Sequence, residues 1–159
     1  MRIVRATLRH VPPLARLMAA SPLLRRYRVS ERGARRNLLS ALRARDILLT
    51  AVEGDAVVGL AWLVPTRALD RAAYLRLLLV AEAHQSRGVG ATLLSRGERR
   101  ARSLGCRHIV MLVTRSNRRA RSFYERHGYA HVGDLPGYVR RGIAESVYVK
   151  SWRQRARSS

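Results

Sequence analysis

The chain has 159 residues, 47% of them hydrophobic, and its 32 lysine and arginine residues against 10 acidic ones give a formal charge of +22. This length and composition predict one folded domain with a real core and exclude an intrinsically disordered chain. No apolar run approaches the ~18 residues of a membrane span, and the first residues lack an apolar signal core. Cys106 is the only cysteine, so no internal disulfide can form. We therefore expect a cytoplasmic protein without a membrane partner.

The positive charge has two interpretations. It can serve a polyanionic partner such as nucleic acid, or it can reflect a bias toward arginine on solvated helix faces. The arginines are spread through every segment, and few aromatic residues lie between them. A groove for nucleic acid needs basic residues on one face together with stacking platforms. Nucleic acid is therefore a possible partner that the pattern does not favour, although the positive field would attract any phosphorylated cofactor.

Hydrophobic periodicity predicts strands alternating with helices, which implies an α/β sheet with some parallel pairing and some hairpins. Thr7 and Ser30 are candidate N-caps, and Glu53-Gly54-Asp55 is a candidate hairpin turn. We expect a domain over residues 1–152, a loop over 133–144 and a polar tail over 153–159. The predicted strands are residues 2–6, 46–52, 56–64, 74–80, 108–113, 129–132 and 146–150. The predicted helices are residues 7–20, 30–45, 91–104 and 117–128.

A glycine loop, Gln85-Ser86-Arg87-Gly88-Val89-Gly90, lies between the apolar run Tyr74–Val80 and the amphipathic stretch Ala91–Leu104. A strand, a glycine loop and a helix start together form an anion-binding device, because the first amides of a helix have no intrahelical partner and the helix dipole adds positive potential. Glycine lets the backbone approach a bulky phosphate, and arginine adds charge-assisted hydrogen bonds. The loop predicts a ligand that carries a diphosphate.

A second motif follows at Asn117-x-x-Ala120-x-x-Phe123-Tyr124, succeeded by Gly128-Tyr129. Together with Gln85-x-x-Gly88-x-Gly90, and at the right separation, it closely resembles the GNAT acetyltransferase family. The resemblance covers the chain from about Val4 to Trp152. It implies a mixed sheet of about six to seven strands with about four flanking helices, in which the central parallel strands 74–80 and 108–113 splay apart.

The resemblance also implies acetyl-CoA as the cofactor. Backbone groups of the first strand would bind the pantetheine amides, the glycine loop would hold the pyrophosphate, and the later helix would contact the pantetheine arm. The implied cofactor residues are Leu78, Leu79, Val80, Gln85, Ser86, Arg87, Gly88, Val89, Gly90, Ala91, Asn117, Ala120, Phe123 and Tyr124. The Val80 N–H would stabilise the developing oxyanion.

Acetyl transfer to an amine requires a base for the amine and an acid for the departing thiolate. Tyr124 is the candidate acid, because a phenol with an ordinary pKa near 10 stays protonated at neutral pH. The alternative interpretation is that Tyr124 is a structural residue of the core that packs beside Phe123. The candidate bases are Glu82, just after the strand, and Glu145, at the mouth of the last strand, with an ordered water chain as a third route. His84, His127 and Cys106 are interpreted as bystanders.

The loop 133–144 is expected to form part of the acceptor wall, with Tyr138 lining the pocket and Arg140 or Arg141 pairing with a substrate carboxylate. A polycationic aminoglycoside is disfavoured by repulsion from the basic chain, so a small amino-acid-like molecule or a protein amine fits better. The second hypothesis is a catalytically weak acyl-CoA-binding or nucleic-acid-associated module with the same fold, since strand 74–80 contains no carboxylate. The protein is expected to be a monomer or a homodimer.

Overall fold

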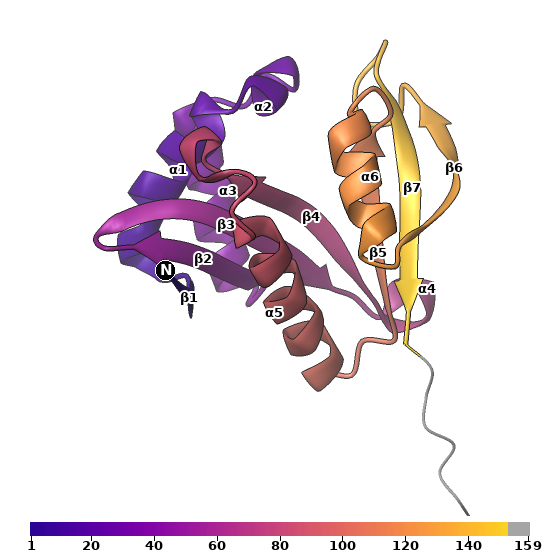
Figure 1. Cartoon of the computed structure of the whole chain (residues 1–159), viewed down its shortest axis with the longest axis horizontal. Coiled ribbons are helices and arrows are strands. Elements are labelled where there is room, and N and C mark those ends of the chain that lie inside the picture. The colour runs from indigo at the N-terminus through magenta and orange to yellow at the C-terminus, as the bar shows by residue number, and fades with distance from the viewer. Residues whose placement is uncertain (153–159) are drawn as a thin grey trace, which may run out of the picture. The chain divides into compact units, whose positions relative to one another are not determined.

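A seven-stranded mixed sheet has the strand order β1-β2-β3-β4-β5-β7-β6 (Figure 1). The computed structural model describes residues 1–152, so the predicted tail 153–159 lies outside the described residues. The predicted α/β class and strand number are confirmed. The strands are β1 Arg2–Arg5, β2 Ile47–Glu53, β3 Ala56–Pro65, β4 Ala72–Val80, β5 His108–Thr114, β6 Ala130–Pro136 and β7 Ala144–Ser151. The helices are α1 Val11–Ala20, α2 Pro22–Arg26, α3 Glu31–Arg43, α4 Ala68–Arg71, α5 Val89–Ser103 and α6 Arg118–Arg126, with 3₁₀ turns η1 Leu8–His10 and η2 Glu82–His84.

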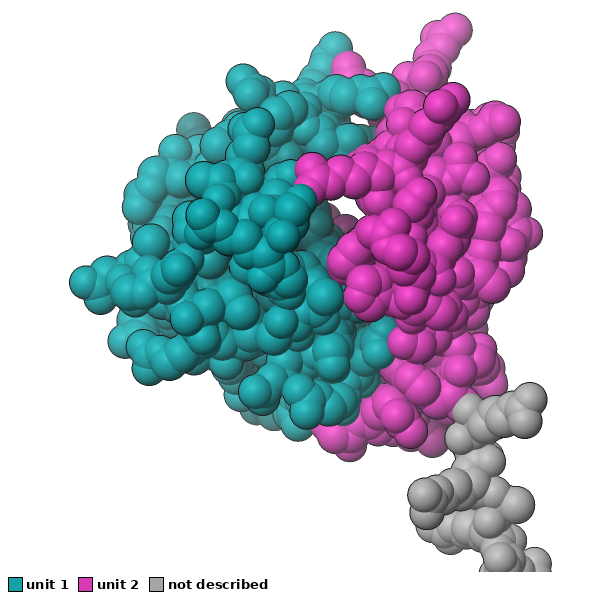
Figure 2. Space-filling view, in the orientation of Figure 1, with its two compact units in different colours: residues 1–64, 77–101 teal, residues 65–76, 102–159 magenta. Residues whose placement is uncertain are grey.

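The chain divides into two compact units, which Figure 2 shows in different colours. Unit 1 contains residues 1–64 and 77–101. Unit 2 contains residues 65–76 and the described residues from 102 onward. Strand β4 contributes its first half to unit 2 and its second half to unit 1.

In unit 1, helices pack on both faces of β3. Successive residues of a strand point to opposite faces, so β3 contributes side chains to both contacts. Leu60 and Trp62 belong to a buried cluster with residues of α1 and α3. On the other face β3 meets α5, where a Cβ on Gly97 would lie 2.8 Å from Leu63 Cδ1. A Cβ on Gly59 would likewise lie 2.9 Å from Leu93 Cδ1. Glycine at both contacts therefore permits the close approach of α5, the helix that follows the glycine loop.

Unit 2 is built on β5, which pairs in parallel with the start of β4 and antiparallel with β7. The parallel register described for β4 and β5 runs from Ala72↔His108 to Leu75↔Met111. The predicted splaying of the two strands beyond this point remains a prediction. Strand β6 pairs antiparallel with β7 alone and forms the edge of the sheet.

Four local features differ from the sequence predictions. The first helix begins as a 3₁₀ turn and becomes α-helical at Val11, where prolines fit the first turn. Ser21 ends that helix as predicted, but its hydroxyl also accepts from the Leu24 N–H and caps the unpredicted helix α2. The predicted loop 133–144 is shorter, because β6 continues to Pro136. Leu104, predicted as the last residue of the helix 91–104, lies beyond the end of α5 and is exposed.

Candidate functional site

The glycine loop in unit 1 has a defined backbone conformation. Gln85 donates from its side-chain Nε2 to the Val80 carbonyl at 3.1 Å, which ties the loop to the end of β4. Ser86 and Gly88 have positive φ values of 61° and 79°. Helix α5 begins at Val89, directly after the second of these residues. The predicted order of strand, glycine loop and helix start is thereby confirmed, with two left-handed residues at the turn.

Conformation explains glycine at position 88. A Cβ there would meet nothing within 4 Å, so the positive φ, and not a steric contact in the protein, is what favours glycine. The Gly88 carbonyl accepts from the Thr92 N–H at 3.0 Å and from the Thr92 hydroxyl at 2.9 Å, so it belongs to the first turn of α5. Val89 is buried and anchors that turn, while Arg87 is exposed beside it. The loop therefore presents backbone and guanidinium donors on an anchored helix start.

The second motif forms α6 in unit 2, and its polar and glycine positions have local structural causes. The Asn117 side chain accepts from the Ala120 N–H at 3.1 Å and caps the helix. At the other end Gly128 has φ of 85° and donates to the Glu125 carbonyl, while Tyr129 N–H donates to the Tyr124 carbonyl. This pair of bonds is the Schellman arrangement that ends helices. The motif thus holds the Tyr124 backbone in a fixed last turn.

Tyr124 is a buried phenol with a polar end that its own unit leaves unpaired. Its side chain is 8% exposed, and its ring meets the rings of Phe123 at 5.2 Å and Tyr129 at 5.7 Å in edge-to-face geometry. Among the described residues of unit 2, no group hydrogen-bonds its hydroxyl. Burial raises the pKa of Tyr124 well above its ordinary value. Such a phenol stays protonated over the whole neutral range and can donate to an acceptor that arrives from outside.

The two candidate bases have opposite environments. Glu82 is exposed on η2 in unit 1. Glu145 is 3% exposed in unit 2, where β7 pairs it with Thr114 of β5 and Leu135 of β6. A buried carboxylate is costly unless it interacts with neighbouring groups, and such carboxylates cluster at functional sites.

Glu145 lies close enough to Tyr74 to affect its ionisation. Burial is the largest cause that raises the pKa of Tyr74, Arg76 lowers it, and Glu145 and Tyr138 raise it further. Tyr74 therefore lies in the neighbourhood of two predicted site residues, Glu145 and Tyr138. Sequence reasoning missed Tyr74, because only the pairing of β4 with β5 and of β5 with β7 creates this neighbourhood.

The remaining candidates have local contacts. His127 hydrogen-bonds the Phe123 carbonyl through Nδ1 at 2.7 Å. His84 contacts Glu53 through Nε2 at 3.0 Å, and the Nδ1 atom of His84 is buried and unpaired within the part of the chain that the structure describes. Tyr138 is 68% exposed in the loop between β6 and β7. The Arg140 carbonyl accepts from the Ile143 N–H at 3.1 Å and closes a turn in the same loop. The substrate roles of Tyr138 and Arg140 remain predictions.

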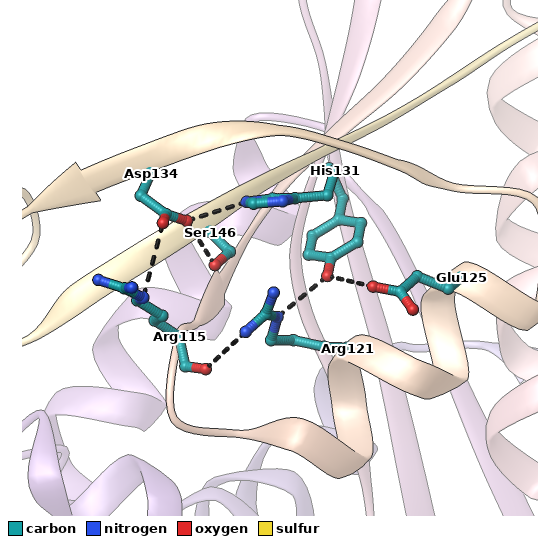
Figure 3. Close-up of polar contacts among 7 residues, drawn as sticks. Arg115, Arg121, Glu125, His131, Asp134 and Ser146 are labelled. Carbon is teal, nitrogen blue, oxygen red and sulfur yellow. Dashed lines mark hydrogen bonds and ion pairs between the residues drawn. The ribbon is translucent and has the colours of Figure 1, made fainter.

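A polar network ties α6 to strands β6 and β7 (Figure 3). The buried Tyr148 hydroxyl donates to Glu125 Oε1 at 2.8 Å and accepts from Arg121 Nε at 3.1 Å. Arg121 also donates to the Arg115 carbonyl at 3.3 Å, in the segment that leads into α6. These bonds fix the orientation of the helix that carries Tyr124.

The second part of this network is centred on Asp134 of β6. Asp134 accepts from the Ser146 hydroxyl at 2.7 Å, contacts His131 Nε2 at 2.9 Å, and lies 3.6 Å from Arg115 Nε. The hydrogen bond from Ser146, followed by that from His131, holds the pKa of Asp134 below its usual value. The serine donates to the aspartate and not to the histidine, so the three side chains do not form a nucleophilic triad.

Comparison with known proteins agrees with these local features. The chain belongs to the acetyltransferase (GNAT) family, whose model matches residues 16–129. No curated protein matches the chain by sequence.

Solved structures have the same fold at low sequence identity. A ribosomal-protein-alanine N-acetyltransferase from Brucella melitensis has a TM-score of 0.79 at 19% identity, over 96% of this chain and 100% of that one. An aminoglycoside 6'-N-acetyltransferase complexed with coenzyme A has a TM-score of 0.81 at 17% identity, over 98% and 99%. A PaiA N-acetyltransferase from Thermoplasma acidophilum, also in complex with coenzyme A, has a TM-score of 0.74 at 17% identity, over 95% and 98%.

No helix within residues 1–152 has the length and apolar character needed to cross a membrane. No group of three histidine, cysteine, aspartate or glutamate side chains in that range is arranged to hold a metal ion.

Proposed function

We propose that this protein transfers the acetyl group of acetyl-CoA to a primary amine by direct attack in a ternary complex. The observation that carries the proposal is the glycine loop, with left-handed backbone at Ser86 and Gly88 and a helix that begins at Val89. Coenzyme A carries a diphosphate, and backbone N–H groups at a helix start suit that group. Membership of the GNAT family and the coenzyme A bound by structurally similar proteins support the same ligand.

The donors of this chain fit the cofactor. In unit 1 the backbone of Gln85–Ala91 would hold the diphosphate, with Arg87 adding charge, and Leu78, Leu79 and Val80 would offer backbone groups to the pantetheine amides. In unit 2 Asn117 retains its amide N–H groups as donors, because only its side-chain oxygen caps α6. Ala120 and Phe123 would supply the apolar contacts. When bound, acetyl-CoA supplies a thioester whose carbonyl carbon accepts the amine nitrogen as the C–S bond breaks.

Tyr124 would act as the acid. Its raised pKa keeps the phenol protonated, and its hydroxyl has no competing partner within unit 2. The proton would pass from Tyr124 Oη to the departing sulfur, and bulk water would restore it. The Val80 N–H would stabilise negative charge that develops on the carbonyl oxygen.

Glu145 is the better candidate for the base. A base must take a proton from the amine at a site that excludes bulk water, so a buried carboxylate is better placed than one on the surface. Glu145 is 3% exposed, whereas Glu82 is exposed on the surface of unit 1. Tyr74, whose ionisation feels the charge of Glu145, would orient that carboxylate or relay its proton through water.

The net charge of the chain and the loop after β6 support a proposed class of acceptor. A chain with a formal charge of +22 repels polycationic acceptors, so a small amino-acid-like molecule or a protein amine is the proposed class. Tyr138 and Arg140 would line the acceptor pocket and pair with an acceptor carboxylate.

Two matched carboxylate variants test the mechanism. The assay follows thiol release from acetyl-CoA over a panel of amines, after calorimetry has established cofactor binding. Glu145→Gln should lower kcat at least about tenfold, because an amide cannot accept the proton. Glu82→Gln should leave kcat unchanged. An unchanged kcat for Glu145→Gln would remove that residue from the mechanism.

The second candidate function is a binding module without catalysis, which is favoured by the absence of a carboxylate from β4. The same experiment separates the two functions. Acetyl-CoA binding without turnover on any amine would support the module, whereas turnover that depends on Tyr124 would support the enzyme.

A further inference from the structure

One surface of unit 1 concentrates positive charge. Residues 25–45 contain eight arginines and one acidic residue, Glu31, which gives a net charge of 8 − 1 = +7. This segment comprises α2, the turn after it, α3 and the start of the next loop. All eight arginine side chains are exposed.

Three of the four arginines of α3, namely Arg32, Arg36 and Arg43, lie along one line of the helix. At 3.6 residues per turn, Arg36 and Arg43 are rotated by only about 40° and 20° from Arg32. The buried residues Ala34, Leu38 and Ala41 lie roughly 180–240° away, against the core that α1 and α3 share. From Arg32 to Arg43 the line is about 16 Å long. Arg28 is exposed in the turn that precedes the helix. We call these four residues the arginine stripe.

The stripe differs in its contacts from several arginines of unit 2. In unit 2, Arg107 pairs with Asp70, Arg115 with Asp134, and Arg121 bonds Tyr148. Within residues 1–152, none of the four stripe side chains makes a hydrogen bond, ion pair or ring contact. Their mutual repulsion is therefore uncompensated by the fold, and an external polyanion would relieve it.

We propose that the arginine stripe binds the phosphate backbone of a double-stranded nucleic acid. Phosphates recur regularly, every ~3.4 Å of axis along each strand, and a straight row of guanidinium groups matches such a regular array better than an irregular acidic protein surface. Helix α3 has no aromatic residue on which an unpaired base could stack, which favours a duplex over a single strand. No large hydrophobic side chain is exposed between residues 21 and 45, so the surface lacks the apolar contacts of a membrane-binding helix. Phosphate contacts alone carry no base sequence, so the binding is independent of sequence.

Salt dependence is the direct test, because each phosphate contact releases counterions. Four contacts predict a slope of log K against log[salt] of about −3.6 from the stripe. Fluorescence anisotropy with 20-base-pair RNA and DNA duplexes between 50 and 200 mM salt measures this slope. The triple variant Arg32→Gln, Arg36→Gln, Arg43→Gln should reduce its size by about 2.7. Glutamine is a good helix former at these exposed positions, and a thermal melt checks that the fold persists.

The matched control removes the same charge elsewhere. Arg96→Gln, Arg99→Gln, Arg126→Gln replaces three exposed arginines of α5 and α6, and it should leave most of the slope intact. Acetyl-CoA binding by the stripe variant should equal that of the wild type, which separates this surface from the proposed catalytic function. No duplex binding at 50 mM salt, equal loss in both variants, or preferential binding to anionic vesicles or polyglutamate would each overturn the proposal.

Discussion

Replacing Tyr124 with phenylalanine removes one oxygen atom from the proposed site. The ring contacts with Phe123 at 5.2 Å and Tyr129 at 5.7 Å do not involve that oxygen, so the packing is retained. Within unit 2 the hydroxyl forms no hydrogen bond that the variant would break. The free energy of unfolding should therefore change by less than about 1 kcal/mol.

Turnover should respond far more strongly than stability. A general acid contributes roughly 10²–10⁴-fold to a rate, which corresponds to about 2.7–5.4 kcal/mol of transition-state free energy. We expect kcat of Tyr124→Phe to fall within that range, measured as thiol release, while calorimetry gives an acetyl-CoA Kd close to that of the wild type. Because the pKa of Tyr124 is raised, the wild-type rate should not fall through loss of this acid below pH 10.

The control variant is Tyr129→Phe, which alters a buried tyrosine packed against Tyr124 in the same unit. It should keep kcat within several-fold of the wild type. A Tyr124→Phe enzyme with wild-type kcat would refute the assignment. So would a loss of kcat that Tyr129→Phe reproduces, since the effect would then come from packing.

Three further predictions concern the loop, the network and the tyrosine. Gly88→Ala places alanine at a φ of 79°, so it should lower the free energy of unfolding by about 1–2 kcal/mol and weaken acetyl-CoA binding. The control Gly54→Ala, at a φ of 59° in the β2–β3 turn, should lower stability as much and leave acetyl-CoA binding unchanged. Thermal melts measure the stability and calorimetry measures the binding. The pKa of Asp134 is lowered in the folded state, so its contribution to stability is present above its unfolded pKa near 3.9 and is lost as pH falls through the lower folded value. Asp134→Asn should therefore make the free energy of unfolding fall less steeply with decreasing pH in this acid range. For Tyr124 the raised pKa has the opposite sense, because the unfolded chain loses the proton first as pH rises above ~10, so stability should fall there in the wild type and less in Tyr124→Phe.

Much of the candidate site could be predicted because its causes are local. The left-handed Gly88, the cap at Asn117 and the helix end at Gly128 each depend on neighbours within a few residues. Helix α5 was predictable from apolar residues at helical spacing, among them Leu93 and Leu94, which are buried in unit 1.

What could not be predicted depends on contacts between distant segments. Tyr74 approaches Glu145 only through the registers of β4, β5 and β7, which no short pattern contains. Strand β6 was predicted too short because its residues Ala130–Asp134 are all exposed, so they lack the alternation that indicates a half-buried strand. The gathering of unneutralised arginines on α3 likewise emerged only when the structure showed which arginines have partners.

Calorimetry with acetyl-CoA tests the central claim most directly, with the wild type and Gly90→Glu compared after both are shown to fold. A carboxylate in the loop would add bulk and negative charge where a diphosphate is to be bound. We predict one-to-one binding by the wild type and no measurable binding by the variant. Absence of binding by the folded wild type, or equal affinity in the two proteins, would contradict the assignment of this loop.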